Sequence, residues 1–112
     1  IMFQDWQTHT QDVKTAFKEL GAEHPKMLKA YGALTQAIDS SVLDDKTREL
    51  ISLAVAVTTR CESCISVHAE AAVKAGASDD EVAAALATAI ALNAGAAYTY
   101  SLRAIEAVKT QR

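Results

Sequence analysis

Two cysteines and a histidine lie close together between Thr58 and Glu70, in the stretch TTRCESCISVHAE. On an α-helix, at about 100° per residue, Cys61, Cys64 and His68 fall within a sector of roughly 60°. Cys64 and His68 are an i, i+4 pair, so their side chains can meet directly. Cys61 and Cys64 are one helical turn apart, which a disulfide can bridge with modest adjustment. The three side chains therefore share one face of the predicted helix.

Cysteines in the first turn of a helix are readily deprotonated, because free N–H groups and the positive end of the helix dipole stabilise a thiolate. His68, as a base or as an imidazolium, would favour the thiolate further. A thiol pair that ionises easily and can close on itself supports two-electron redox chemistry. The dipole favours Cys61 as the attacking sulfur, whereas the nearby base favours Cys64. The residues alone leave both assignments open.

Glu49 is a second candidate site residue, because it lies in the first half of the apolar segment ELISLAVAV. A carboxylate on a buried helix is costly unless it is paired or protonated. Placed against the start of the cysteine-bearing helix, Glu49 could accept a proton from His68 or from a cysteine. The alternative is that Glu49 pairs with Arg48 or Arg60 at the surface.

The same cysteines allow two other interpretations. A zinc site needs three or four ligands, and this sequence has no second CxxC and no HxxxH to complete one. Small thiols also pack well on alanine-rich helices, so the pair could be purely structural. His9 and His24 lie far along the chain and are more typical of solvated or capping residues. We therefore expect neither a metal ion nor a bound cofactor.

Apolar residues recur at helical spacing. The chain has only one proline and four glycines, which are few turn residues for a β protein. A first helix should begin after Thr10 as its cap, and a second at Pro25. A third, capped near Asp44, carries the apolar segment and should lie centrally. A fourth should run from about Cys61 to Ala75.

The last part of the chain contains the strongest local signal, a capping box of Ser78 and Glu81 in SDDE. It predicts a fifth helix to about Leu92, where Asn93 and Gly95 weaken the pattern before a sixth helix. We predict one all-α domain over residues 1–112, a compact bundle of about six helices with its motif-bearing core at about 43–98.

Composition bears on partners and location. The chain has 112 residues, with 23 alanines and only six aromatic residues. Such a chain has a thin core, so we expect a homo-oligomer. The net charge is −3 and no basic run occurs, which argues against nucleic acid or an anionic membrane as partner. The longest apolar stretches, Leu50–Val57 and Val82–Leu92, are short for a bilayer span. Without a recognisable signal peptide, the expected location is the cytoplasm, where thiols rest reduced.

The order Glu49, Cys61, Cys64, His68 has the form E-x11-C-x2-C-x3-H. It resembles the AhpD-like alkylhydroperoxidases of the carboxymuconolactone decarboxylase superfamily. LDDKTRELISLAVAV is similar to the helix before the motif in that family, and HAEAAVKAGASDDEVAAALATA to its core segment. The resemblance covers about Leu43 to Tyr98. The sequence departs from the best-studied members at Ser63, where they often carry another histidine.

The resemblance implies an all-helical, obligate trimer or hexamer that reduces organic hydroperoxides. Cys64 would be the peroxidatic cysteine and Cys61 the resolving one, with His68 and Glu49 as the proton relay. A dithiol, thioredoxin-like or lipoyl donor would reopen the resulting disulfide. Two alternatives remain. One is a carboxymuconolactone-type decarboxylase, although such members generally lack the cysteine pair. The other is a non-catalytic oligomer that senses oxidants through the same disulfide.

Overall fold

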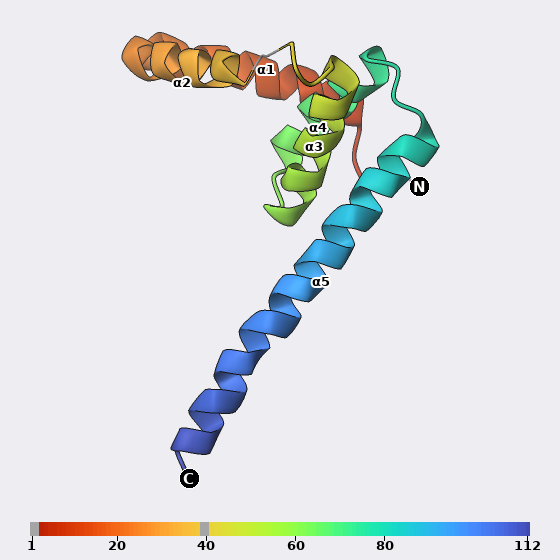
Figure 1. Cartoon of the computed structure of the whole chain (residues 1–112). Helices are drawn as coiled ribbons and strands as arrows, with labels where there is room; N and C mark the ends of the chain where they lie inside the picture. The colour runs from red at the N-terminus through yellow and green to blue at the C-terminus, as the bar shows by residue number, and fades with distance from the viewer. Residues whose placement is uncertain (1–2, 39–40) are drawn as a thin grey trace.

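Five α-helices account for most of the chain in a computed structural model that describes residues 3–38 and 41–112. They are α1 (Trp6–Glu23), α2 (Pro25–Ala37), α3 (Asp45–Thr58), α4 (Glu62–Lys74) and α5 (Asp79–Thr110). No strand occurs in the described ranges, so the predicted all-α class is confirmed. Figure 1 shows α1 and α2 as a hairpin on one side of α3 and α4, with α5 running away from them.

Several helices begin where local signals predicted. Pro25 is the first residue of α2, and the Asp44 carboxylate accepts the Thr47 N–H at 2.7 Å to cap α3. Ser78 Oγ accepts the Glu81 N–H at 3.1 Å, while Glu81 Oε1 accepts the Ser78 N–H at 3.0 Å. This is the predicted capping box, which satisfies two donors at the start of α5.

The prediction that Thr10 caps the first helix is wrong. Helix α1 begins at Trp6, because Asp5, five residues before Thr10, accepts the Thr8 N–H at 3.1 Å and supplies the cap. Thr10 lies inside the helix and is buried. Its hydroxyl donates to the Trp6 carbonyl and contacts the hydroxyl of buried Ser66 on α4. The side chain therefore joins α1 to α4.

The predicted break at Asn93 and Gly95 is also wrong, and the two last predicted helices form the single helix α5. The Asn93 side-chain amide donates to the Ala89 carbonyl at 2.7 Å, which seats it against the preceding turn. Glycine and asparagine each cost roughly up to 1 kcal/mol in a helix interior. The many alanines on both sides favour the helix enough to offset that cost.

The packed part of the molecule is small. Helix α3 packs against α4 and α5, α1 packs against α4, and α2 packs against α1. The buried apolar side chains are Leu53, Ala56, Ala72 and Ala89, and α5 is exposed throughout residues 91–110. The radius of gyration is 18.2 Å, whereas a compact chain of this length has about 13 Å. The monomer is therefore extended.

Because α5 is continuous, its apolar stretch is longer than the sequence suggested. Within the described ranges it is the one helix long and apolar enough to cross a membrane by length and composition alone, with a mean hydropathy of 1.4. This is weak evidence for a membrane span, because the core helices of proteins that have no span can be equally long and apolar. Only 6% of this apolar window is buried within the chain.

Candidate functional site

The turn between α3 and α4 places the first cysteine. Arg60 follows the end of α3 in the left-handed region, with φ of 52°. Its N–H donates to the Val57 carbonyl at 3.3 Å, and the Cys61 N–H donates to the Ala56 carbonyl at 3.0 Å. This is the Schellman pattern, which usually has glycine at the left-handed position. The chain therefore reverses sharply, and Cys61 lies directly beyond the end of α3.

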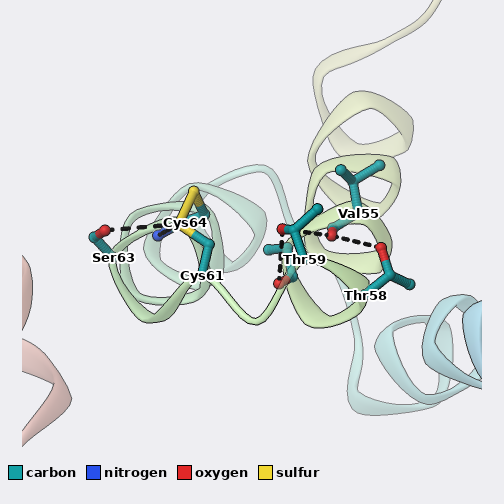
Figure 2. Close-up of a disulfide and its surroundings, with 7 residues drawn as sticks. Val55, Thr58, Thr59, Cys61, Ser63 and Cys64 are labelled. Carbon is teal, nitrogen blue, oxygen red and sulfur yellow. Dashed lines mark hydrogen bonds between the residues drawn. A yellow bond between two sulfur atoms is a disulfide. The ribbon is translucent and has the colours of Figure 1, made fainter.

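Cys61 is the N-cap of α4, and its Sγ accepts the Cys64 N–H at 3.2 Å. The two cysteines form a disulfide with their Cα atoms 5.2 Å apart. Figure 2 shows this bond at the first turn of α4, beside Thr58 and Thr59 at the end of α3. Both sulfurs thus lie at the positive end of the helix dipole, which favours a thiolate after reduction.

His68 and Glu49 form a short hydrogen bond, with His68 Nδ1 and Glu49 Oε2 2.6 Å apart. The two residues meet because α3 and α4 form a hairpin, so that Glu49 on α3 lies opposite His68 on α4. The Glu49 side chain is 14% exposed and that of His68 is 34% exposed. A carboxylate on Nδ1 favours the tautomer with Nδ1–H, which leaves Nε2 as the basic nitrogen of the neutral ring.

An open cleft of about 570 Å³ lies beside the disulfide. Cys64 and His68 line it, whereas Cys61 and Glu49 do not. Helix α4 supplies one wall, and α1 and α2 supply the other. The full lining is Gln11, Val13, Lys14, Thr15, Phe17, Lys18, Tyr31, Thr35, Ser63, Cys64, Val67 and His68. A molecule in this cleft would meet the Cys64 side of the disulfide and the imidazole together.

The structure thus brings the four predicted residues together as two bonded pairs, Cys61 with Cys64 and His68 with Glu49. Among the described residues, no hydrogen bond joins Cys64 to His68. In the oxidised form the Cys64 sulfur has no proton to donate, so the two side chains share only the cleft. No group of three or more His, Cys, Asp or Glu side chains in the described ranges is arranged to hold a metal ion.

Sequence reasoning missed the far wall of the cleft. Phe17 and Tyr31 lie against each other there, with ring centroids 5.4 Å apart. Lys14 Nζ lies 2.7 Å from Glu70 Oε1 and links this wall to α4. The sequence predicted the two helices that carry these side chains. No local pattern indicated that faces of these helices lie opposite a cysteine more than thirty residues away.

Residues 25–107 match the carboxymuconolactone decarboxylase family. The chain belongs to this family. An uncharacterised protein of Haemophilus influenzae is 72% identical over 112 residues, which is 99% of each chain. Uncharacterised protein 4 in the cox locus of Paracoccus denitrificans is 35% identical over 77 residues, 68% of this chain and 69% of that one. The crystal structure of an apo carboxymuconolactone decarboxylase family protein from Legionella pneumophila has a TM-score of 0.74 at 31% identity, covering 93% and 94% of the two chains.

These findings confirm the resemblance to the carboxymuconolactone decarboxylase superfamily, with which an AhpD-like fold agrees. The family match includes Glu49, both cysteines and His68. It begins at Pro25, so all of α1 lies outside the matched range, including its cleft residues Lys14 and Lys18.

Proposed function

We propose that this carboxymuconolactone decarboxylase family protein is a thiol peroxidase that reduces organic hydroperoxides. The observation that carries the proposal is the arrangement around Cys64. Cys64, one half of a CxxC disulfide, lines an open cleft together with His68, and the His68 ring is held by a largely buried carboxylate. Reduction of this disulfide would release a thiolate at a helix start with a base beside it.

The first step consumes the hydroperoxide. The reduced Cys64 thiolate attacks the terminal oxygen of R–O–O–H, so an S–O bond forms and the O–O bond breaks. Cys64 becomes a sulfenic acid, and the leaving RO⁻ takes a proton to become the alcohol ROH. That proton comes from His68, which acquired it from the Cys64 thiol, and Glu49 stabilises the imidazolium in between.

The second step closes the disulfide. The Cys61 thiol attacks the Cys64 sulfenic acid, so the S–S bond forms and water leaves. The observed 5.2 Å between the two Cα atoms is already suited to this bond. The net reaction is ROOH plus two thiols to ROH, water and a disulfide. A dithiol of the thioredoxin or lipoyl class would then reduce the bridge and complete the cycle.

The other two functions use this site differently. A carboxymuconolactone-type decarboxylase would have no use for the cysteine pair. A redox sensor would use the same disulfide, but it would not turn over repeatedly with a reductant. Recycling therefore separates the proposed enzyme from a sensor.

The test is oxidation of the fully reduced protein with cumene hydroperoxide, followed by mass spectrometry and by turnover with a panel of dithiol donors. We expect one equivalent of peroxide to convert both thiols of a chain into the Cys61–Cys64 bridge. Cys64→Ser should not react, whereas Cys61→Ser should leave a sulfenic acid on Cys64 that a cyclic diketone traps. Two persistent free thiols in the wild type would rule out the peroxidase, and the reverse mutant pattern would exchange the two roles.

A further inference from the structure

We propose that the cleft selects hydroperoxides that carry a carboxylate at the far end of an apolar chain, the class of oxidised fatty acids. Lys18 is the residue that would bind the carboxylate. This inference rests on the proposed peroxidase function and names the substrate class of that same site. It is carried by the size of the cleft, the charges along it and the positions of Cys64 and Lys18 in its lining.

The cleft is larger than a small peroxide needs, and much of its lining is apolar. At about 570 Å³ it lies within the range of pockets that bury drug-sized ligands. Val13 and Phe17 come from α1, Tyr31 from α2 and Val67 from α4. Their side chains would cover a hydrocarbon chain on several sides, and burial of its methylene groups away from water would stabilise the complex.

The charges along the cleft favour an anion. Lys14, Lys18 and His68 line it, and no carboxylate of the described residues does, although the whole chain has a net charge of −3. Lys14 is engaged by Glu70, and that hydrogen bond lowers the pKa of the Glu70 carboxyl. Lys18 makes no ion pair with a described residue. Its ammonium group is therefore available to a bound carboxylate.

The positions of Cys64 and Lys18 set the two ends of the ligand. Thr10 contacts Ser66 and Lys14 contacts Glu70, so α1 meets α4 over about one turn of each helix. Cys64 precedes Ser66 on α4 and Lys18 follows Lys14 on α1, and both residues line the cleft. A ligand that reaches both residues would carry its hydroperoxide and its carboxylate at opposite ends of the apolar chain.

The experiment measures single-turnover oxidation of the reduced protein by the hydroperoxide of an unsaturated long-chain fatty acid and by that of its methyl ester. Both substrates are kept below their micelle concentrations, at low salt. We expect the wild type to react with the acid roughly five- to tenfold faster than with the ester, and the preference to shrink as salt screens the charge. Lys18→Gln should bring the two rates together by slowing only the acid, while Lys18→Arg should keep the preference.

Lys29→Gln is the matched control, because Lys29 is exposed on α2 and does not line the cleft. It should leave both rates unchanged. Equal rates for acid and ester in the wild type would overturn the substrate class while leaving the peroxidase intact. A preference that survives in Lys18→Gln would overturn the role of Lys18. If cumene hydroperoxide also leaves Cys64 unoxidised, the proposed function itself fails.

Discussion

A carboxylate that is only 14% exposed needs a partner, and Glu49 has one in His68, whose ring lines the cleft beside Cys64. The spacing of the motif allowed this arrangement, because Cys64 and His68 are one turn apart on a helix. The contact between Glu49 and His68 depends on how sharply α3 turns into α4. In that turn Arg60 has a left-handed backbone conformation. The sequence did not indicate this conformation, because glycine is the usual residue there.

If His68 is the base for Cys64, its removal should make the thiol harder to ionise. In a Cys61→Ser background, which leaves one thiol, we expect His68→Ala to move the pH midpoint of alkylation upward by about one pH unit. Glu49→Gln should move it less in the same direction, because the amide can still orient the ring but cannot stabilise an imidazolium. The measurement is the rate of reaction with iodoacetamide from pH 5 to 10.

His24→Ala is the control for the alkylation experiment. The His24 ring accepts the Met27 N–H at 3.2 Å and caps α2, away from the cysteines. It should leave the midpoint unchanged. An unchanged midpoint in His68→Ala would remove His68 from the activation of Cys64.

At the scale of the helices, the sequence predicted what depends on neighbours along the chain. Three predicted helix starts are confirmed, at Pro25, Asp44 and the Ser78–Glu81 box. The caps of Asp44 and the box accept free N–H groups of the first turn, and Pro25 has no N–H that needs a partner. Contacts between distant segments were not predictable in this way. The Thr10–Ser66 contact and the α1 wall of the cleft arise from packing between helices, which the periodicity of one helix does not specify.

The start of α5 also makes an acid-sensitive link. Glu81 accepts the Ser78 N–H and lies 2.8 Å from Lys46 Nζ on α3. The hydrogen bond from Lys46, followed by that from Ser78, lowers the pKa of the Glu81 carboxyl. A group whose pKa is lower in the folded state stabilises the fold above its unfolded pKa, about 4.3 for Glu, and loses that effect as the pH falls through the folded value. Stability from this link should therefore begin to decline as the pH falls below about 4.3.

Glu81→Gln tests this link, since glutamine can still accept the Ser78 N–H but has no charge for Lys46. We expect the variant to unfold at lower urea concentration than the wild type at pH 7, and the difference to shrink between pH 5 and pH 3. Glu19→Gln is the control, because Glu19 is exposed on α1 and has no ion-pair partner among the described residues. A difference between Glu81→Gln and wild type that stays constant over this range would contradict the mechanism.

The whole molecule exposes far more surface than a folded monomer of its mass. Its accessible surface is 8947 Å², whereas a monomeric protein of 11.9 kDa exposes about 5,900 Å². The excess is roughly 3,000 Å² per chain, and obligate subunit interfaces bury about 2,000–5,000 Å² or more summed over both partners. Much apolar surface lies on the distal half of α5, which Figure 1 shows extending away from the other helices. Its exposed large side chains include Leu92, Tyr98, Leu102, Ile105 and Val108.

We propose that this half of α5 packs against other copies of the chain, and the trimer or hexamer implied by the family resemblance stays a prediction. Light scattering after gel filtration should give a multiple of the 11.9 kDa chain mass. Leu102→Glu with Ile105→Glu should lower that mass, because burying two carboxylates in an apolar interface costs several kcal/mol. Lys29→Glu on α2 also introduces negative charge, without touching α5, and should leave the mass unchanged. A wild type that is monomeric at every concentration, or that sediments with phospholipid vesicles, would show that the apolar face of α5 has another role.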